Sequence, residues 1–377
     1  MEAGNASYEP LPALLSPGGE PDRELLDAID DVVRDLVNQV LQGEAPRLEP
    51  LNQHANSVAI SFLSNPLQFT RVLSVLESAQ EAALRDGKNT QRDLFYGMKE
   101  GLPAGVVGSV QETYSAVNRA CELLLMERNR LHITSSSKGL VAGNLSINKD
   151  GPWLSGTSTQ AGIPIPGDLD VLARMHVRIS SNCRCILVVE KDAIFQRLLD
   201  DKLFDLVPCV LITGKGVPDL ATRMLLRKLH EQAGPALPVI GLADYNPSGV
   251  GILCVYRFGA LKDAAESRSF RVDCSVPLQW LGVRSEHLAV CDGSESSGCG
   301  GAGSRGQARR PLSEADLRLL GGMLRRDAHV PVGSAWREEL LVMQAGAVKA
   351  EIEAVANWHG PQFAEWVARN VLQRRWI

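Results

Sequence analysis

The sequence predicts an α/β protein with a parallel sheet in its C-terminal part, preceded by an α+β N-terminal part. Three short apolar runs carry this prediction, "CILVVE", "CVLIT" and "LPVIGLAD", and helical patterns separate them. Apolar runs of four to eight residues, bounded by Gly and Pro, are typical of buried parallel strands. A β-α-β-α-β series of this kind builds a parallel sheet with helices on its faces.

The first 57 residues predict a leader and one helix. Residues 1–22 are polar and rich in Pro, Gly and Ala, so we expect them to be disordered. Within residues 23–57, "ELLDAIDDVVRDLVNQVL" has apolar residues at helical spacing, which predicts an amphipathic helix. Its apolar stripe either binds a partner or packs on the next domain.

Two longer segments follow. Residues 58–165 combine short helices with a small β-hairpin predicted around "LVAGNLSIN" and "GPWLSG". Residues 171–377 carry the parallel-sheet pattern. Within them, residues 292–310, "DGSESSGCGGAGSRGQARR", have too little apolar content to pack, so we predict a flexible surface insertion.

Composition narrows the class of protein. The chain has 377 residues, 45% of them hydrophobic, which is enough for two or three domains. Its formal net charge is −5, so any basic surface for nucleic acid must be local. No apolar run approaches the ~20 residues that span a bilayer, and the eight cysteines form no framework of disulfide spacings. We therefore expect an intracellular protein with reduced thiols and no membrane partner.

Two of the predicted strands end in a carboxylate, Glu190 and Asp244. Ligands bind at the carboxyl ends of parallel strands, so we expect both side chains at one edge of the sheet. Oxygen ligands suit Mg²⁺, which one or two carboxylates hold while waters and phosphates complete its shell. The alternative is that each acid merely caps the following helix. A nicotinamide or flavin site is disfavoured, because "KDAIFQRL" after Glu190 contains no glycine.

Tyr96 is the strongest candidate for a nucleophile among the five tyrosines. Its context, "NTQRDLFY", predicts a helix start and places Arg92 near the phenol. A phenol has a reference pKa near ~10, so a tyrosine nucleophile needs a nearby cation or a base to take its proton. On the residues alone, a tyrosine in this position is more often a packed aromatic side chain than a nucleophile.

Six motifs occur in an order that one protein family shares. They are "RDLFYGM", "SSSKGLVAGNL", "VVEKDAIFQRLL", "LITGKGVPDLATRMLLRKL", "LADYNPSGVGILCVYRFG" and "VGSAWREELLVMQAGAVKAEIEAV". The chain resembles the meiotic double-strand-break family called Spo-eleven and its relative, the A subunit of topoisomerase VI, from about Thr70 to the C-terminus. The resemblance implies a winged-helix (CAP-like) domain over residues 58–165. It also implies a Toprim domain, a Rossmann-like parallel sheet, over residues 171–377.

The same resemblance implies a DNA transesterase. Tyr96, assisted by Arg92, would attack a backbone phosphate of duplex DNA, leaving a five-prime phosphotyrosyl link and a free three-prime hydroxyl. Mg²⁺ at Glu190, Asp244 and Asn246 would neutralise phosphate charge. In the family the tyrosine of one protomer meets the metal of the other, which implies a homodimer or a heterodimer with a paralogue. The resemblance also implies action on chromosomes in the nucleus, together with a topoisomerase VI B-like partner subunit.

One position departs from the family pattern. The usual D-x-D pair reads Asp244, Tyr245, Asn246 here, so the second carboxylate is an amide. An amide oxygen still binds Mg²⁺ but brings no charge, which lowers the expected affinity. The alternative function is therefore a DNA-binding paralogue with an impaired metal site, which serves in binding or assembly. A hydrolytic Toprim nuclease or primase-like enzyme is a third, more distant interpretation.

Basic residues near the predicted strand ends are candidates for contacts with DNA phosphates. They are Lys138, Lys191, Lys215 and Arg223. Each is equally compatible with a solvated surface charge. Since the chain is acidic overall, a DNA-binding surface requires several such residues to gather locally.

Overall fold

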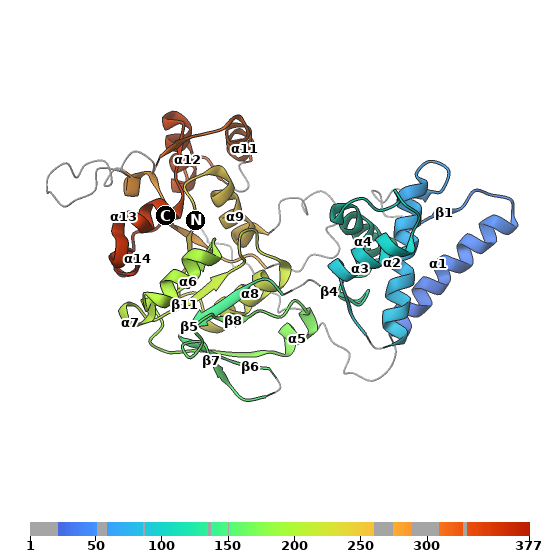
Figure 1. Cartoon of the computed structure of the whole chain (residues 1–377), viewed down its shortest axis with the longest axis horizontal. Helices are drawn as coiled ribbons and strands as arrows, with labels where there is room; N and C mark the ends of the chain where they lie inside the picture. The colour runs from blue at the N-terminus through green and yellow to red at the C-terminus, as the bar shows by residue number, and fades with distance from the viewer. Residues whose placement is uncertain are drawn as a thin grey trace, which may run out of the picture. The chain divides into compact units, whose positions relative to one another are not determined.

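The structure is a computed structural model that describes residues 22–50, 59–85, 87–134, 137–149, 151–259, 274–288, 309–326 and 330–377. The predicted leader, apart from Asp22, and the predicted insertion, apart from Arg309 and Arg310, lie outside these residues. The chain divides into two compact units, coloured by residue number in Figure 1. The first unit covers the described residues up to 137 together with Pro166–Ala173, and the second covers Lys138–Ile165 and the described residues from 174 onward.

The first unit is mainly helical. Its helices are α1 (Arg23–Leu41), α2 (Pro66–Leu84), α3 (Gln91–Gly101) and α4 (Val110–Leu124). Short strands pair beside them, β1 (Arg47–Leu48) with β2 (Ile60–Ser61) and β3 (Asn89–Thr90) with β4 (Ile133–Thr134). Apolar side chains from all four helices share one core, including Ile29, Val75, Met98 and Val117. This core holds α3, the helix that carries Tyr96.

The amphipathic helix that the sequence predicts within residues 23–57 corresponds to α1, which ends at Leu41. Gly43 follows in the left-handed region at φ 77°, a conformation that ends helices and favours glycine. The N-terminal half of α1 buries its apolar face, whereas Val37 and Val40 in the C-terminal half are exposed. The apolar stripe is therefore only partly used inside the first unit.

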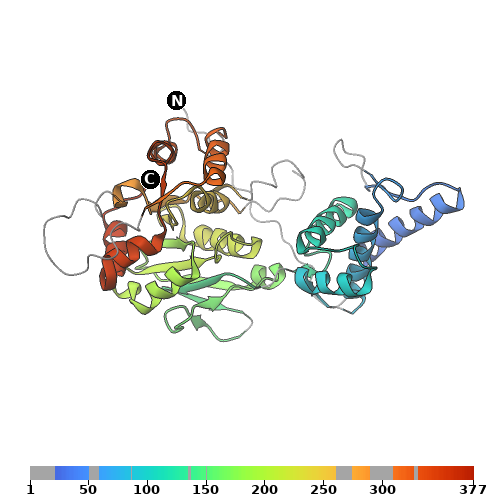
Figure 2. The same ribbon diagram turned by 45° about the horizontal axis from the view of Figure 1, so that its top comes forward.

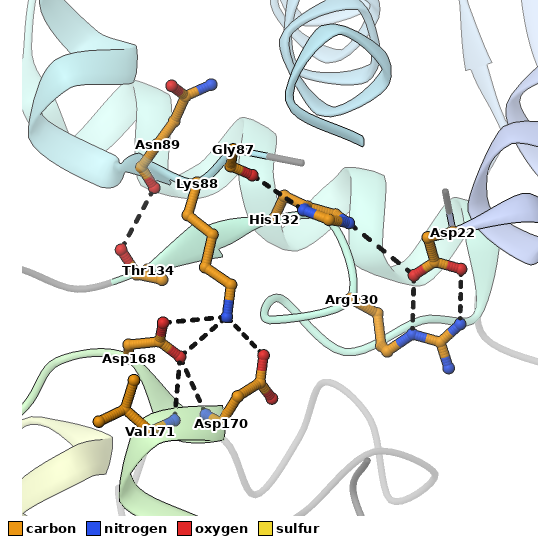
Figure 3. A network of polar contacts seen from close by, with 10 residues as sticks. All are labelled: Asp22, Gly87, Lys88, Asn89, Arg130, His132, Thr134, Asp168, Asp170 and Val171. Carbon is orange, nitrogen blue, oxygen red and sulfur yellow. Dashed lines mark hydrogen bonds and ion pairs between the residues drawn. The ribbon is translucent and has the colours of Figure 1, made fainter. Parts of the chain in front are cut away.

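Asp22 anchors the start of α1. Its carboxylate accepts the backbone N–H of Leu25 as an N-cap, and it also accepts the Arg130 guanidinium at 2.9 Å (Figure 3). In the same view, the Nδ1 atom of His132 lies 2.9 Å from the carbonyl oxygen of Gly87. These contacts tie the first helix to the segment that leads into β4.

Charged side chains join Pro166–Ala173 to the rest of the first unit. The Lys88 ammonium lies 2.9 Å from both carboxylate oxygens of Asp168 and also pairs with Asp170 (Figure 3). Asp168 accepts the backbone N–H of Asp170 at the start of the short helix α5 (Leu169–Arg174). The segment thus belongs to the first unit, although strands of the second unit flank it in sequence.

The second unit is built on a six-stranded sheet with the order β13-β12-β10-β11-β5-β8. Four neighbouring strands are parallel, namely β13 (Gln279–Gly282), β12 (Val239–Leu242), β10 (Cys185–Val189) and β11 (Cys209–Thr213). Strands β5 (Leu140–Gly143) and β8 (Ile163–Pro164) extend the sheet in antiparallel fashion. Every residue of β10, β11 and β12 is buried, which confirms the predicted parallel sheet.

Helices pack around this sheet (Figures 1 and 2). They are α6 (Asp192–Asp200), α7 (Leu203–Leu206), α8 (Leu220–Ala233), α9 (Pro247–Phe258), α11 (Glu314–Leu324), α12 (Ala335–Gly346), α13 (Ile352–His359) and α14 (Phe363–Leu372). A 3₁₀ turn, Gly360–Gln362, joins the last two, and β14 (Arg310–Pro311) pairs with β15 (Val348–Lys349). In the part of the chain that the structure describes, no helix is both long and apolar enough to cross a membrane.

The division between the units differs from the predicted domain boundary. The predicted winged-helix domain extends to residue 165, but Lys138–Ile165 belong to the second unit. The predicted hairpin does form, between β6 (Leu145–Asn148) and β7 (Leu154–Ser155), and β9 (His176–Ile179) completes a three-stranded sheet. Its strands join the second unit because their apolar faces are buried there, and β9 packs on α8. The winged-helix assignment of the first unit stays a prediction.

Candidate metal centre and nucleophile

Glu190 and Asp244 lie together at the carboxyl ends of β10 and β12. The two strands pair in parallel, with Val189 opposite Leu242, so the residues that follow them meet at one edge of the sheet. The backbone N–H of Asp244 donates to Oε2 of Glu190 at 2.8 Å, and both side chains are buried. The sheet therefore gathers the two carboxylates that sequence reasoning singles out.

The start of α13 packs against the sheet edge that carries Glu190 and Asp244, which we call the acidic edge. The backbone N–H of Ile352, the first residue of α13, donates to Oδ1 of Asp244 at 2.8 Å. The Lys191 ammonium lies 3.1 Å from the same oxygen and 2.6 Å from Oε2 of Glu353. Its distance to Oε2 of Glu351 is 3.7 Å. One cation thus links Asp244 to two glutamates from the C-terminal part of the chain.

Burial and like charge make the acidic edge costly to ionise. Burial, reinforced by the Asp244 charge, raises the pKa of Glu190 to about 7. Burial also raises the pKa of Asp244, although the Ile352 N–H and the Lys191 charge oppose the shift. Burial would lower the pKa of Lys191, but its pairing with Glu353 and Asp244 outweighs that effect and the pKa is raised. A cation bound here would relieve the repulsion between the carboxylates.

Tyr96 lies on α3 in the first unit. The helix begins with a capping box, in which Thr90 accepts the Asp93 backbone N–H and the Asp93 carboxylate accepts the Thr90 N–H. Phe95 is buried in the core, whereas Tyr96 is 49% exposed, with its ring edge-on to Phe95. Arg92 lies one turn earlier on the same face of the helix, because residues four apart are neighbours on a helix surface. Tyr96 and Arg92 are therefore both exposed, at positions one turn apart on α3.

The folded chain matches known proteins across both units. Residues 185–367 match the family model for the Toprim domain that Spo11 shares with the A subunit of topoisomerase 6. The chain is 34% identical to meiotic recombination protein SPO11-2 of Oryza sativa subsp. japonica over 361 residues. The aligned region covers 91% of this chain and 86% of that protein. The chain belongs to the family of SPO11 proteins and topoisomerase 6 A-type chains.

Other members of the family extend the similarity. Meiotic recombination protein SPO11 of Homo sapiens is 29% identical over 354 residues, which cover 88% of this chain and 83% of that protein. The A3 subunit of DNA topoisomerase 6 from Oryza sativa subsp. indica is 32% identical over 310 residues, covering 82% of this chain and 63% of that protein. The acidic edge is therefore part of the Toprim domain of a SPO11-family chain.

The donor set of this Toprim domain fits Mg²⁺. Glu190 and Asp244 supply only oxygen atoms, and burial raises the pKa of both carboxyl groups, so a bound cation would favour their ionised forms. Among the described residues, no three His, Cys, Asp or Glu side chains form a ready-made metal cluster. Two carboxylates nevertheless suffice for Mg²⁺, which commonly keeps several waters and binds substrate phosphates. The Lys191 ammonium already supplies part of the positive charge that a bound Mg²⁺ ion would bring to this edge.

Asn246 is used structurally. Its Oδ1 atom accepts the backbone N–H of Gly249 at 2.7 Å and caps α9, while its Nδ2 atom lies 3.3 Å from Oδ2 of Asp244. Gly249 lies close to the backbone of Asp244, where a Cβ atom would meet the Asp244 carbonyl oxygen at 2.5 Å. Tyr245, between the two polar residues, is buried and pairs through its backbone with Ala350. A role for Asn246 as a metal ligand stays a proposal.

The predicted DNA-binding residues of the second unit have different surroundings. Lys138 donates to the carbonyl oxygen of Val217 at 2.9 Å, and the Lys215 ammonium lies 3.1 Å from Oδ2 of Asp192. Lys215 is part of the loop after β11, and Lys138 contacts this loop. The Gly216 N–H of the same loop donates to the Glu190 carbonyl oxygen. Arg223 is half-buried on α8. Lys215 thus lies on a loop anchored to the acidic edge, Lys138 contacts that loop, and Lys191 lies within the edge.

Glu351 and Glu353 are the residues of the acidic edge that sequence reasoning missed. They flank Ile352 in "KAEIEAV", and this acid-apolar-acid pattern at a helix start is the only local signal for them. Acids in the first turn are ordinary in helices, because they complement the positive end of the helix dipole. Their contact with Lys191, more than 150 residues earlier in the chain, follows only from the tertiary fold.

Replacing Lys191 with Met tests whether the acidic edge depends on a cation. We expect the free energy of unfolding in EDTA to fall by about 1–2 kcal/mol, because Asp244 and Glu353 would lose their shared counter-charge. Saturating Mg²⁺ should restore much of this loss, since the metal ion replaces the ammonium. Urea denaturation with and without Mg²⁺ measures both effects.

Lys349→Met is the matched control. Lys349 has a similar exposure, and its ammonium pairs with Asp316 at 2.6 Å outside the acidic edge. The control variant should also lose stability but should gain no more from Mg²⁺ than the wild type. An equal Mg²⁺ effect in both variants would contradict a cation site at Glu190 and Asp244.

Proposed function

We propose that this SPO11-family chain makes meiotic DNA double-strand breaks by tyrosine transesterification and thereby initiates homologous recombination. The observation that carries the proposal is that Glu190 and Asp244 are buried together at one edge of the Toprim sheet. The backbone nitrogen of Asp244 lies 2.8 Å from Oε2 of Glu190. The exposed Tyr96 phenol supports it as the nucleophile. The meiotic role is supported by relatives that are named meiotic recombination proteins.

The proposed reaction exchanges one phosphate ester for another. The phenolic oxygen of Tyr96 forms a bond to the phosphorus atom of a backbone phosphate, while the bond from phosphorus to the three-prime oxygen breaks. The phenolic proton leaves, and the three-prime oxygen ends as a hydroxyl group. Arg92, one helical turn before Tyr96, favours the phenolate and the charged phosphate. The number of ester bonds is unchanged, so the reaction is reversible.

Glu190 and Asp244 are the residues that would hold Mg²⁺, and Asn246 would contribute an amide oxygen if its contact with Gly249 is given up. The bound ion would supply charge neutralisation at the DNA phosphate. Lys138, Lys191 and Lys215 would contact neighbouring phosphates, because Lys191 lies at the acidic edge, Lys215 lies on the loop anchored to it and Lys138 contacts that loop. Arg223 is proposed as a further DNA contact.

Two staggered cuts require two copies of the nucleophile, so we propose that a homodimer or a heterodimer with a paralogue acts on duplex DNA. A topoisomerase VI B-like subunit is the proposed partner, and the exposed residues Val37 and Val40 of α1 offer it an apolar surface. The proposed site of action is the chromosome in the nucleus.

One observation favours a second function. Asn246 replaces a carboxylate and its oxygen caps α9, so the metal site has less charge than a D-x-D pair provides. The alternative is a chain that binds DNA without cutting it and serves in binding or assembly. Such a chain would keep its contacts with DNA and partners while forming no covalent link.

The deciding experiment is covalent trapping of duplex DNA labelled at its three-prime ends, in the presence of a B-like partner subunit, because the fragment on the three-prime side of each cut stays joined to the tyrosine. The transesterase predicts a Mg²⁺-dependent protein–DNA adduct that survives denaturation in SDS and disappears in EDTA. Protein that binds the duplex with its partner but yields no adduct at any Mg²⁺ concentration would favour the role in binding or assembly. Release of a five-prime phosphate without an adduct would instead indicate a hydrolytic nuclease.

A further inference from the structure

The three-stranded sheet of the second unit has one buried face and one exposed face. Ser146 of β6 pairs with Ser155 of β7 and with Arg178 of β9, so these three side chains share a face. On the other face, Leu145, Ile147 and Val177 are buried. The exposed side, defined by Ser146, Asn148, Trp153, Ser155, His176 and Arg178, is called the outer face below.

The outer face carries an aromatic ring held by a guanidinium group. Trp153, immediately before β7, is 38% exposed. The Arg178 guanidinium lies over its ring, 4.0 Å from the ring centroid. Stacking of this kind fixes both side chains, which are otherwise costly to order. The sheet thus presents a preformed aromatic platform with a positive charge against it.

The surroundings of the outer face are basic. The described residues 144–149, 151–160 and 174–184 contain no Asp or Glu. In the sequence, Asp150 lies between the first two stretches, and Asp168 and Asp170 lie between the last two, where they pair with Lys88 of the first unit. Exposed basic side chains occur throughout these stretches, namely Lys149, Arg174, His176, Arg178 and Arg184. The whole chain has a formal net charge of −5, so this concentration of basic residues is local. It complements an anionic partner.

The outer face is separate from the acidic edge. Asn144, which leads into β6, donates its backbone N–H to the carbonyl oxygen of Cys209 at the start of β11. Arg184, after β9, likewise contacts the segment that enters β11. The three-stranded sheet therefore lies at the amino ends of the parallel strands, whereas Glu190 and Asp244 follow their carboxyl ends. Figures 1 and 2 both show the β6–β7 hairpin at the far margin of the second unit from α11 and α12.

We propose that the outer face binds single-stranded DNA, with one unpaired base stacked on Trp153 and the adjoining phosphates on Arg178 and Lys149. Aromatic side chains and a basic groove are the two features with which proteins hold single strands. A duplex hides the faces of its bases, so an exposed tryptophan ring on a sheet favours unpaired DNA over duplex DNA. The choice of DNA as the nucleic acid rests on the proposed function.

The test is binding of a fluorescent dT20 oligonucleotide to the full-length chain, measured by anisotropy. Trp153→Ala should weaken binding about tenfold, since loss of one stacked base costs about 1–3 kcal/mol by alanine substitution. Arg178→Gln should weaken it about threefold and reduce the slope of log affinity against log salt by about 0.7. Trp153→Phe retains a stacking ring and should stay within about threefold of the wild type.

Matched controls are available on the same unit. Trp358 on α13 is 36% exposed and Arg318 on α11 is exposed, and neither belongs to the outer face. Trp358→Ala and Arg318→Gln should bind dT20 like the wild type. A wild-type chain that does not bind dT20, or a Trp153→Ala variant with unchanged affinity, would overturn the proposal. If Trp153→Ala lowered the affinity for dT20 and for a blunt duplex by the same factor, the proposal would also be overturned, because the outer face would then bind the backbone of duplex DNA.

The outcome is separable from that of the proposed function. Tyr96→Phe should lose the covalent adduct and keep its affinity for dT20, while Trp153→Ala should do the reverse. If the wild type forms no adduct but Trp153→Ala still weakens dT20 binding, the outer face stands and the transesterase fails. A stronger effect of Trp153→Ala on a single-stranded RNA of the same length would assign the face to RNA and overturn the choice of DNA.

Discussion

Tyr96→Phe is expected to lower the yield of covalent protein–DNA adduct at least about a thousandfold, to the background of the assay, because the substitution removes only the attacking oxygen. Tyr96 is half exposed and its ring packs edge-on against buried Phe95, a contact that a phenylalanine ring preserves. The fold and the affinity for duplex DNA should therefore change little. The measurement is SDS-resistant transfer of labelled DNA to the protein in the presence of Mg²⁺ and the B-like partner.

Tyr114→Phe is the matched control for this prediction. Tyr114 lies on α4 in the same unit and is partly buried, so loss of its hydroxyl group should leave the adduct yield within about twofold of the wild type. An adduct that persists in Tyr96→Phe would show that another side chain is the nucleophile. Arg92→Lys distinguishes charge from geometry, because it keeps the cation near Tyr96 while removing the planar guanidinium.

Asp244→Asn is expected to weaken Mg²⁺ binding at least about a hundredfold, since changes outside the ligand shell alone cost about 10–100-fold in metal affinity. The amide oxygen still accepts the Ile352 N–H that now contacts Oδ1, so the start of α13 should keep its position. The charge that attracts the metal and Lys191 is lost. Calorimetric titration with Mg²⁺, together with the adduct yield at each Mg²⁺ concentration, measures the effect.

Asn246→Asp is the opposite change at the same edge. Aspartate is as good an N-cap as asparagine, so its contact with the Gly249 N–H and the start of α9 should survive. The added carboxylate beside Asp244 should tighten Mg²⁺ binding about tenfold. Weaker or unchanged Mg²⁺ binding would mean that position 246 does not face the metal, and the low charge of the D-x-N pattern would then say nothing about activity.

The strand-end acids were predictable because the signals for them are local. Buried parallel strands appear as uninterrupted apolar runs, and Glu190 and Asp244 each follow such a run directly or after one residue. The signal for α3 is local as well, because the capping pattern of Thr90 and Asp93 marks the start of this helix. Chain order and strand polarity are then enough to bring the two carboxylates to one edge, as the pairing of β10 with β12 requires.

The sequence by itself therefore determined the parallel sheet, the helix that carries Tyr96 and the strand ends that carry the acids, since periodicity and caps act within a few residues. Only the tertiary structure decided that Lys191 pairs with Glu353 and Glu351, and that the Oδ1 atom of Asn246 caps a helix. It also decided that Lys138–Ile165 join the second unit. These outcomes depend on packing between segments far apart in the chain, where one ammonium or one apolar face selects its partner by proximity and burial rather than by sequence spacing.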